Sequence, residues 1–413
     1  MFIFKKELLF LRICTLFFLS FFVAVTVYAV DKSYLGKPQA LVVDKTAEEF
    51  IFGMLLVGPY NDHGWSQSHF EAGKYLQSNI PLSKFLYIDK VNPADRPGIT
   101  VVQLVDDLVE KGAEFIIANS DDMKDGIREA AEKYSDVKFV HVSGDDVLTG
   151  KSPENLSNLM GKMEYCKMMA GFCAALTTKT GKVGYLGPLV NDETRRLAVS
   201  CYLGAKYGWE KVLHKDPDDL KFNVTWIGYW FNIPGVTADP IQVVHNFYSN
   251  GFDVVISGID TTEALAVANR KRLEGKEVWA LPYDYSGACS EAPKACLGVP
   301  YFNWVPGYTR LIKMAMAGKW KPSWLWLGPD WENINNISTS SVGFLTGDAM
   351  PHYVRGPLNK FIKDLGEKKI NLFKGPLYYQ DKTVFLKDGE IATDKKIWYL
   401  KQLLSGMKGQ NSR

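Results

Sequence analysis

Several short segments of the chain place aromatic rings beside amide, hydroxyl or carboxylate groups directly after apolar, strand-like runs. Aromatic faces with fixed polar groups suit a flat ligand that has polar edges, such as a nucleobase, because the ring stacks while hydrogen bonds recognise its edge. We therefore predict a site for a small, flat molecule. The candidate ligand-binding residues in these segments are Tyr60, Asp62, Trp65, Ser66, Ser120, Asp121, Trp230, Phe231, Asp260 and Asp284.

Each of these residues also has a structural alternative. A Trp at the end of a strand often packs in the core and binds no ligand. Asp260 precedes TTEALAV and Asp121 precedes DGIREAAEKY, so both are candidates for helix N-caps. Because such groups recur at the strand ends of both halves of the chain, we favour a binding site carried by Trp65, Trp230 and Asp284.

Motifs for catalysis, cofactors or metals are absent from the sequence. It contains no G-x-G-x-x-G after a strand, no H-E-x-x-H, no G-x-S-x-G and no EF-hand loop. The six histidines are scattered, without an i,i+4 pair that could chelate a metal. We therefore expect a binding protein without a cofactor or metal. A nucleoside-processing α/β enzyme is the alternative, and it would need a base or metal set at one sheet edge.

Two successive series of strands and helices must position the candidate residues. Short β-branched or apolar runs alternate with amphipathic stretches, which is typical of parallel strands covered by helices on both faces. Ligands of such sheets bind beyond the carboxyl ends of the strands, so two facing edges predict a cleft. The predicted strands are 50–59, 85–91, 114–120, 137–144, 182–188, 222–230, 253–259 and 278–284, and the predicted helices are 68–80, 98–112, 125–135, 164–180, 194–208, 239–251 and 262–275.

The predicted fold class is α/β, with two Rossmann-like lobes whose parallel sheets are flanked by helices. We assign residues 50–160 and about 298–322 to the first lobe, and 161–297 and about 323–400 to the second. The section 297–400 is less regular and rich in aromatic residues, and we interpret it as elements that return to both lobes. A separate third domain is the alternative.

The beginning of the sequence has the pattern of an export signal. Basic residues precede an apolar run over 13–27, and small residues follow at the positions that a signal peptidase reads, ending at Ala29. We predict a cleaved signal peptide over 1–29 and a periplasmic or otherwise extracytoplasmic protein. An uncleaved membrane tether is the alternative, because the apolar stretch 13–30 just reaches the length that spans a bilayer.

The charge of the chain argues against nucleic acid as a partner. The sequence has 48 Lys and Arg residues against 46 Asp and Glu residues. Lys5, Lys6, Arg12 and Glu7 fall in the predicted signal, so the remaining positive and negative charges balance. A balanced chain lacks the basic excess that holds a polyphosphate backbone.

The cysteines of the expected exported chain include one candidate disulfide. Cys289 and Cys296 lie in a Gly/Pro/Ala loop, and their separation in the sequence allows a bridge in an oxidising compartment. The alternative is that both remain free. Cys166 and Cys173 lie in an apolar helical pattern, where a buried thiol acts as a small hydrophobic side chain.

Four segments of the sequence resemble a known family. They are GMLLVGPYNDHGWSQSHFEAGKYL, EYCKMMAGFCAALTTKTGKVGYLGP, WFNIPG and IKMAMAGKW. Over about residues 50–330 the chain resembles the basic membrane protein family, the purine-nucleoside-receptor-like substrate-binding proteins of ABC importers. The resemblance implies a type I periplasmic-binding-protein fold with a three-crossover hinge, a purine base or nucleoside as ligand, and an ABC permease as partner. We expect a monomer.

The resemblance also implies roles for single residues. Trp65 falls where an aromatic ring of the first lobe stacks on the base, and Trp230 and Phe231 fall where the second lobe supplies the opposing face. Asp284 corresponds to a carboxylate that contacts the sugar or the base edge, and Asp260 to a polar position near the cleft.

Two positions differ from the nucleoside-binding members. Ser66 and Gln67 stand where those members have Asn, and Asn303-Trp304 stand where they carry a Lys. Trp304 joins the candidate ligand-binding residues, and the choice between free base and nucleoside stays open. The resemblance implies that the lobes close about the hinge onto the ligand. A tethered ligand-sensing domain is the alternative function.

Overall fold

The structure is a computed structural model that describes residues 49–411. The predicted signal peptide over 1–29 lies outside the described residues. Within the described part of the chain, no helix is both long and apolar enough to cross a membrane.

The first lobe is built on a six-stranded parallel sheet in the order β11-β5-β4-β3-β1-β2. Its central strands are short apolar runs that are wholly buried, as in FIIA of β3, because helices cover both faces of the sheet. The strands are β1 (Phe50–Leu55), β2 (Ser83–Ile88), β3 (Phe115–Ala118), β4 (Lys138–Val142), β5 (Leu156–Gly161) and β11 (Trp324–Leu327); the helices are α1 (Trp65–Asn79), α2 (Val101–Glu110), α3 (Lys124–Lys133), α4 (Asp146–Thr149) and α9 (Val305–Met316).

The second lobe is built on a five-stranded parallel sheet in the order β15-β7-β6-β8-β9. Helices α5 and α6 pack closely against each other, while α7 and α8 form another contacting pair. The strands are β6 (Lys182–Gly187), β7 (Lys221–Trp226), β8 (Val254–Ser257), β9 (Trp279–Leu281) and β15 (Met407–Lys408); the helices are α5 (Glu164–Thr177), α6 (Asp192–Tyr207), α7 (Pro240–Ser249), α8 (Glu263–Leu273), α10 (His352–Gly366) and α11 (Asp394–Trp398).

Three segments connect the two sheets. The chain first crosses from β5 to α5, then returns through β10 (Gly298–Phe302), and crosses again through β12 (Val342–Thr346). β10 and β12 pair antiparallel, so the second and third crossovers form a two-stranded connector. α9, which follows β10, packs against α1, and α10, which follows β12, packs against α5. The predicted three-crossover connection of two α/β lobes is confirmed.

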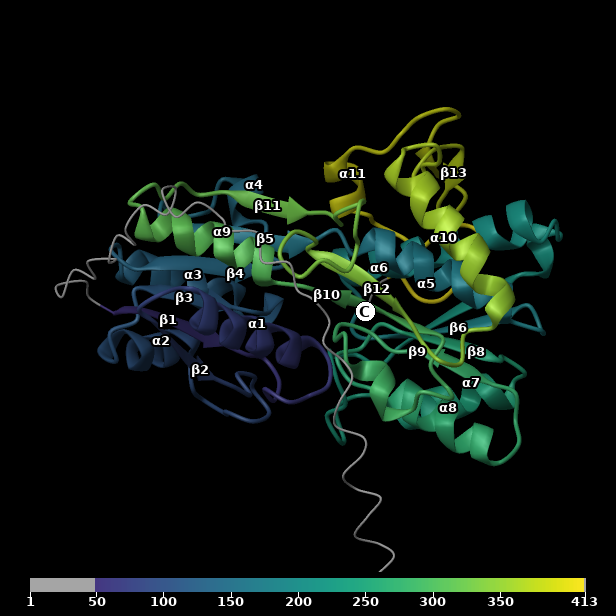
Figure 1. The fold of residues 1–413 in the computed structure, drawn as a ribbon, viewed down its shortest axis with the longest axis horizontal. Coiled ribbons are helices and arrows are strands. Elements are labelled where there is room, and N and C mark those ends of the chain that lie inside the picture. Colours follow the sequence, from purple (N-terminus) through teal and green to yellow (C-terminus); the bar gives the residue numbers. More distant parts are fainter. Residues whose placement is uncertain (1–48, 412–413) are drawn as a thin grey trace, which may run out of the picture. The chain divides into compact units, whose positions relative to one another are not determined.

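Two strands differ from the sequence-based assignment. β5 is not among the strands that the sequence predicts, because Ser157 and Asn158 interrupt its apolar run although both are buried. β11 pairs with β5 in the first sheet, whereas the sequence placed everything after about residue 323 in the second lobe. Figure 1 shows the late strand β11 beside β5, with α9 on the same lobe.

The part of the chain after α10 includes a short antiparallel hairpin of β13 (Leu377–Tyr378) and β14 (Val384–Leu386). After α11, the short strand β15 adds to the edge of the second sheet beside β7. Elements of the late section thus lie in both lobes, as expected.

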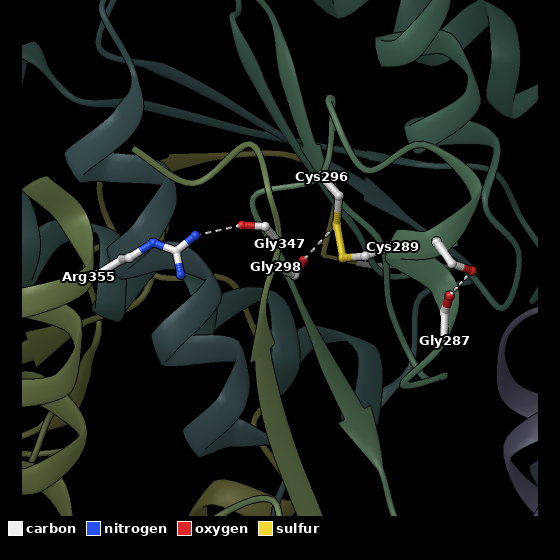
Figure 2. The surroundings of a disulfide bond; sticks show 7 residues. Gly287, Cys289, Cys296, Gly298, Gly347 and Arg355 are labelled. Carbon is white, nitrogen blue, oxygen red and sulfur yellow. Dashed lines mark hydrogen bonds between the residues drawn. A yellow bond between two sulfur atoms is a disulfide. The ribbon is translucent and has the colours of Figure 1, made fainter. Parts of the chain in front are cut away.

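The predicted bridge between Cys289 and Cys296 is present, with the two Cα atoms 5.5 Å apart. Figure 2 shows the bridge beside β10, where the Cys296 sulfur lies 3.6 Å from the carbonyl oxygen of Gly298. Cys166 and Cys173 are free and buried in α5, as small apolar side chains. The disulfide therefore ties a loop of the second lobe to the start of the connector between the lobes.

Candidate functional site

A cavity of about 420 Å³, its opening to solvent included, lies between the carboxyl ends of the two sheets. Both lobes contribute to its wall, so its shape depends on how far the lobes close. The lining residues are Trp65, Ser120, Asp121 and Ser143 from the first lobe, and Tyr185, Glu193, Thr194, Leu197, Trp230, Gly258, Asp260 and Tyr283 from the second.

Trp65 is the first residue of α1, and its indole is fixed from several sides. Its Nε1 donates to the carbonyl oxygen of Asn119 at 2.8 Å. Its ring meets His69 and Trp304 edge-on, with centroid distances of 4.7 and 5.2 Å. The side chain is only 7% exposed. Because these contacts are made within the first lobe, the ring is preorganised at the cavity wall before any ligand arrives.

Asp62 positions Trp65 by holding the start of α1. Its carboxylate accepts hydrogen bonds from the backbone N–H groups of Gly64, Ser66 and Gln67, at 2.8 to 2.9 Å. These are among the free N–H groups that every helix leaves at its N-terminus. Burial raises the pKa of Asp62 to about 6, although the backbone donors oppose the shift. Neither Asp62, in the turn before α1, nor Ser66, in the first turn of α1, lines the cavity.

Trp230 belongs to the second lobe, but its ring is held by the first. Its Nε1 donates to Oδ1 of Asp122 at 3.3 Å, and the neighbouring Tyr229 hydroxyl donates to the other oxygen of that carboxylate. The carbonyl oxygen of Trp230 accepts from the N–H of Asp260 at 3.0 Å. The lobes are therefore closed on one another, with Asp122 joining them at the cavity.

The cavity wall carries three carboxyl groups and no Lys, Arg or His. Burial raises the pKa values of Asp121 and Asp260, and the charges of Asp284 and Asp62 raise that of Asp260 further. Burial also raises the pKa of Glu193 to about 7, although Arg196 opposes this shift. Such a wall offers oxygen atoms to N–H and O–H donors, and it disfavours phosphate because no cation faces the ligand.

Behind this wall lies a buried cation that the sequence analysis missed. Lys167 on α5 donates to the carbonyl oxygen of Ser257 at 2.7 Å, and its Nζ lies 3.2 Å from the ring centroid of Tyr283. Burial lowers its pKa to about 8, while the charge of Asp284 opposes the shift. A lone Lys in the apolar run EYCKMMAGFCAAL was the available signal.

Asp284 is completely buried and adopts a positive φ of 71°. Neither of its carboxylate oxygens has a hydrogen-bond partner among the described residues. Burial raises its pKa well above the usual range, and the charge of Lys167 opposes that shift. Asp284 does not line the cavity in this closed arrangement.

The structure brings together five of the eleven predicted residues at the cavity: Trp65, Ser120, Asp121, Trp230 and Asp260. The N-caps of the neighbouring helices are Thr262, Ser120 and Met123, so the helix-cap alternative for Asp260 and Asp121 is wrong.

Tyr60, Phe231 and Trp304 lie away from the cavity wall. Tyr60 is 40% exposed and packs against Phe70, and Phe231 meets Tyr229 edge-on. Trp304 is buried behind Trp65 in a stack with His69. The sequence analysis did not single out Ser143, Tyr185, Glu193, Thr194, Leu197, Gly258 or Tyr283 as lining residues. Glu193 and Thr194 come after strand β6, and this position in the sequence could have identified them as candidate lining residues.

Comparison with known proteins assigns the chain to a family. The family described as ABC transporter substrate-binding protein PnrA-like matches residues 51–329, which is more than half of the chain. The chain belongs to this family. The predicted resemblance is therefore confirmed, and so is the coarse function, which is solute binding for an ABC transporter.

Two relatives of this substrate-binding protein are named for the ligand that they bind. A purine-binding protein of Brucella abortus is 25% identical over 366 residues, spanning 87% of this chain and 93% of the relative. A putative ABC transporter glucose-binding protein of Haloferax volcanii is 22% identical, spanning 66% of this chain and 62% of the relative. A solved ABC transporter solute-binding protein of Aeropyrum pernix has a TM-score of 0.61 at 11% identity, covering 78% of this chain and 92% of that one. The last similarity confirms the type I periplasmic-binding-protein fold.

Proposed function

We propose that this substrate-binding protein carries a purine base or nucleoside in the cavity between its lobes and delivers it to an ABC permease. The observation that carries the proposal is the pair Trp65 and Trp230, one from each lobe, on the wall of one acidic cavity. Indole rings suit the faces of a flat heterocycle, and carboxylates suit its N–H groups. The purine-binding relative from Brucella abortus supports the same ligand class.

The proposed mechanism is closure of the lobes around the connector. A ligand that touches both Trp65 and Trp230 binds the closed arrangement better than the open one, so it shifts the population toward closure. Asp260, Asp121 and Glu193 would accept hydrogen bonds from the ligand edge. Ser120, which also lines the cavity, and Asp284 are proposed as further polar contacts of the ligand. In this proposal the closed, loaded protein is the form that meets the permease outside the cytoplasm.

Calorimetric titration of the exported form, from residue 30 onward, tests the ligand. Adenine, adenosine, AMP and glucose are compared. We expect binding of adenine or adenosine, no binding of AMP, and at least a tenfold loss of affinity in Trp65→Ala, about 1.4 kcal/mol. Trp320→Ala is the matched control, because Trp320 lies in the first lobe outside the cavity.

Binding of glucose alone would replace the purine proposal with a sugar and keep the fold. Wild-type affinity in Trp65→Ala would contradict the assignment of the cavity. Delivery is tested separately by uptake of labelled purine in cells that lack this chain. N-terminal sequencing of the exported protein distinguishes cleavage after about Ala29 from a tether.

A further inference from the structure

A second cavity lies beside the first crossover between the lobes. It is distinct from the cavity between the carboxyl ends of the two sheets, which we call the cleft. It encloses about 970 Å³, its opening included, and ten of its fifteen lining residues are apolar or aromatic. None of its residues lines the cleft. Part of its wall, including Phe373 and Ala392, comes from beyond residue 329, where the family match ends. We call it the hinge cavity.

The wall of the hinge cavity belongs to both lobes. Trp326 is on β11 in the first sheet, and Lys162 lies in the crossover itself. Glu164 and Met168 are on α5 of the second lobe. When the lobes open about the connector, Trp326 must move relative to α5, so the width of this cavity depends on closure. A molecule that fits one width better than the other shifts the balance between open and closed lobes.

Glu164 lines this cavity and has one side-chain oxygen that lacks a partner among the described residues. Its side chain is 6% exposed, and its Oε1 accepts from Nε of Arg196 at 2.7 Å. Its Oε2 is buried and has no hydrogen-bond partner among the described residues. An unpaired buried acceptor is costly, and a ligand donor would relieve that cost. The cavity therefore offers a hydrogen bond to one N–H or O–H group.

The remaining charges at the hinge cavity are already paired or exposed. Arg196 neutralises Glu164, and Lys162 pairs with Asp394 at 2.7 Å. Lys368 is exposed to solvent. An added charge on the ligand would thus be buried without a counter-ion of its own, which is strongly unfavourable. The occupant that the wall favours is uncharged.

We infer that the hinge cavity binds an uncharged, mainly apolar small molecule with one hydrogen-bond donor, and that its occupancy changes how the lobes close. The aromatic faces of Trp326 and Phe373 suit a flat ring, and Glu164 accepts from its donor. The site would act as an effector site beside the cleft. This inference does not depend on the identity of the cleft ligand.

The test uses indole and N-methylindole as probes, which have the same bicyclic ring but differ in the single donor. Calorimetric titration of the exported form is expected to give at least tenfold tighter binding of indole. Ala392→Phe, which fills the cavity, is expected to weaken indole binding at least tenfold, whereas Ala317→Phe at an exposed site leaves it unchanged. Glu164→Gln keeps the shape of the side chain and is expected to remove the preference for indole over N-methylindole. This variant still tests the inference if Ala392→Phe does not fold.

One further variant distinguishes binding in the cleft from binding in the hinge cavity. Trp65→Ala is expected to keep indole binding within twofold, since Trp65 lines only the cleft. Loss of indole binding in Trp65→Ala, equal binding of the two probes, or no binding of either would overturn the inference. Small-angle scattering with saturating indole is expected to change the radius of gyration, and an unchanged radius would overturn the coupling to closure.

Discussion

At the scale of single residues, Gly64 shows how closely the closed lobes approach. A Cβ atom at this position would lie 1.6 Å from the carbonyl oxygen of Asp260 in the other lobe. The φ of Gly64 is −148°, so this glycine lies outside the left-handed region. The contact between the lobes leaves no room for a side chain at this position.

Gly64→Ala is therefore expected to hinder closure without unfolding either lobe. We expect a loss of ligand affinity of at least tenfold and a larger radius of gyration with ligand present, while the unliganded melting temperature changes little. Titration calorimetry and small-angle scattering measure both quantities. Gly356→Ala is the control, because a Cβ there meets nothing within 4 Å. Normal closure in Gly64→Ala would show that the lobes can close with a different contact.

Glu193 gives a prediction for the dependence of stability on pH. Burial raises its pKa from 4.5 to about 7, so the folded state holds a proton that the unfolded state releases between these values. The free energy of unfolding should therefore fall as pH rises from about 4.5 to about 7, and above that range the decrease is complete. Asp62, with a pKa raised to about 6, contributes in the same direction at lower pH.

Glu193→Gln should accordingly raise the urea midpoint at pH 8 more than at pH 4.5, because the amide has no proton to lose. Urea unfolding of the unliganded protein at both pH values provides the measurement. Glu154→Gln changes the net charge equally at an exposed site and serves as the control. An equal effect of the two variants at pH 8 would contradict the assignment to Glu193.

The residue types predicted the cavity better than they predicted which side chains reach it. Trp65, Trp230 and Asp260 belong to the segments that follow β1, β7 and β8, so their place at the sheet edge was expected from the topology. Whether Trp304 faces a ligand depends on its stack with His69, which joins residues more than 230 positions apart. Such packing is not visible in a single sequence.

At the scale of elements, the turn that carries the disulfide also joins the lobes. Oε1 of Glu291 lies 2.7 Å from Nδ1 of His63 in the first lobe, and its other oxygen accepts from the Thr262 hydroxyl at 2.7 Å. Cys289, two residues before Glu291, is bonded to Cys296 at the start of the connector. The bridge therefore fixes the position from which Glu291 contacts the other lobe.

Reduction of the bridge is expected to lower the free energy of unfolding by about 2 kcal/mol, the entropy gained by releasing a short loop in the unfolded chain. Ligand affinity should fall as well, because Glu291 loses its fixed position. Denaturant unfolding and calorimetry with and without reductant measure the two effects. The double variant Cys289→Ala/Cys296→Ala should show the lower stability and no further response to reductant. A response in that variant would assign the effect to another thiol.

Among the elements, the alternating strands and helices of both lobes were predictable from hydrophobic patterning. β5 was not, because its buried Ser157 and Asn158 make it look polar in the sequence. Their side chains bond to the backbone of Ser323 and Val147, at 3.0 and 2.9 Å, which satisfies them inside the sheet. β11 was assigned to the wrong lobe since its partner, β5, had not been recognised as a strand.

At the scale of the whole described molecule, the late part of the chain reaches from the second lobe to the first. The Tyr399 hydroxyl donates to Asp145 at 2.9 Å, and Asp145 pairs with Lys124 at 2.7 Å. Asp394 pairs with Lys162 in the first crossover. The contact between Tyr399 and Asp145 exists only while the lobes are close, so it favours the closed arrangement even without ligand.

Tyr399→Phe removes one of these contacts and keeps the ring. We expect a loss of ligand affinity of up to about fivefold, in line with the roughly 1 kcal/mol of one hydrogen bond. Tyr378→Phe, at an exposed position in the hairpin, is the matched control in calorimetry. Equal affinities of Tyr399→Phe and the wild type would show that this contact does not contribute to closure.

The place of β11 and β15 sets the order in which the chain can fold as it emerges from a ribosome or an export channel. The first sheet is complete only when residues 324–327 pair with β5, and the second only when residues 407–408 pair with β7. Neither lobe can therefore be completed by a nascent chain that ends at the first crossover. Vectorial folding of this protein stays unfinished until nearly all of the described chain has emerged, and until then β5 and β7 are unpaired on one side and open to pairing with other chains.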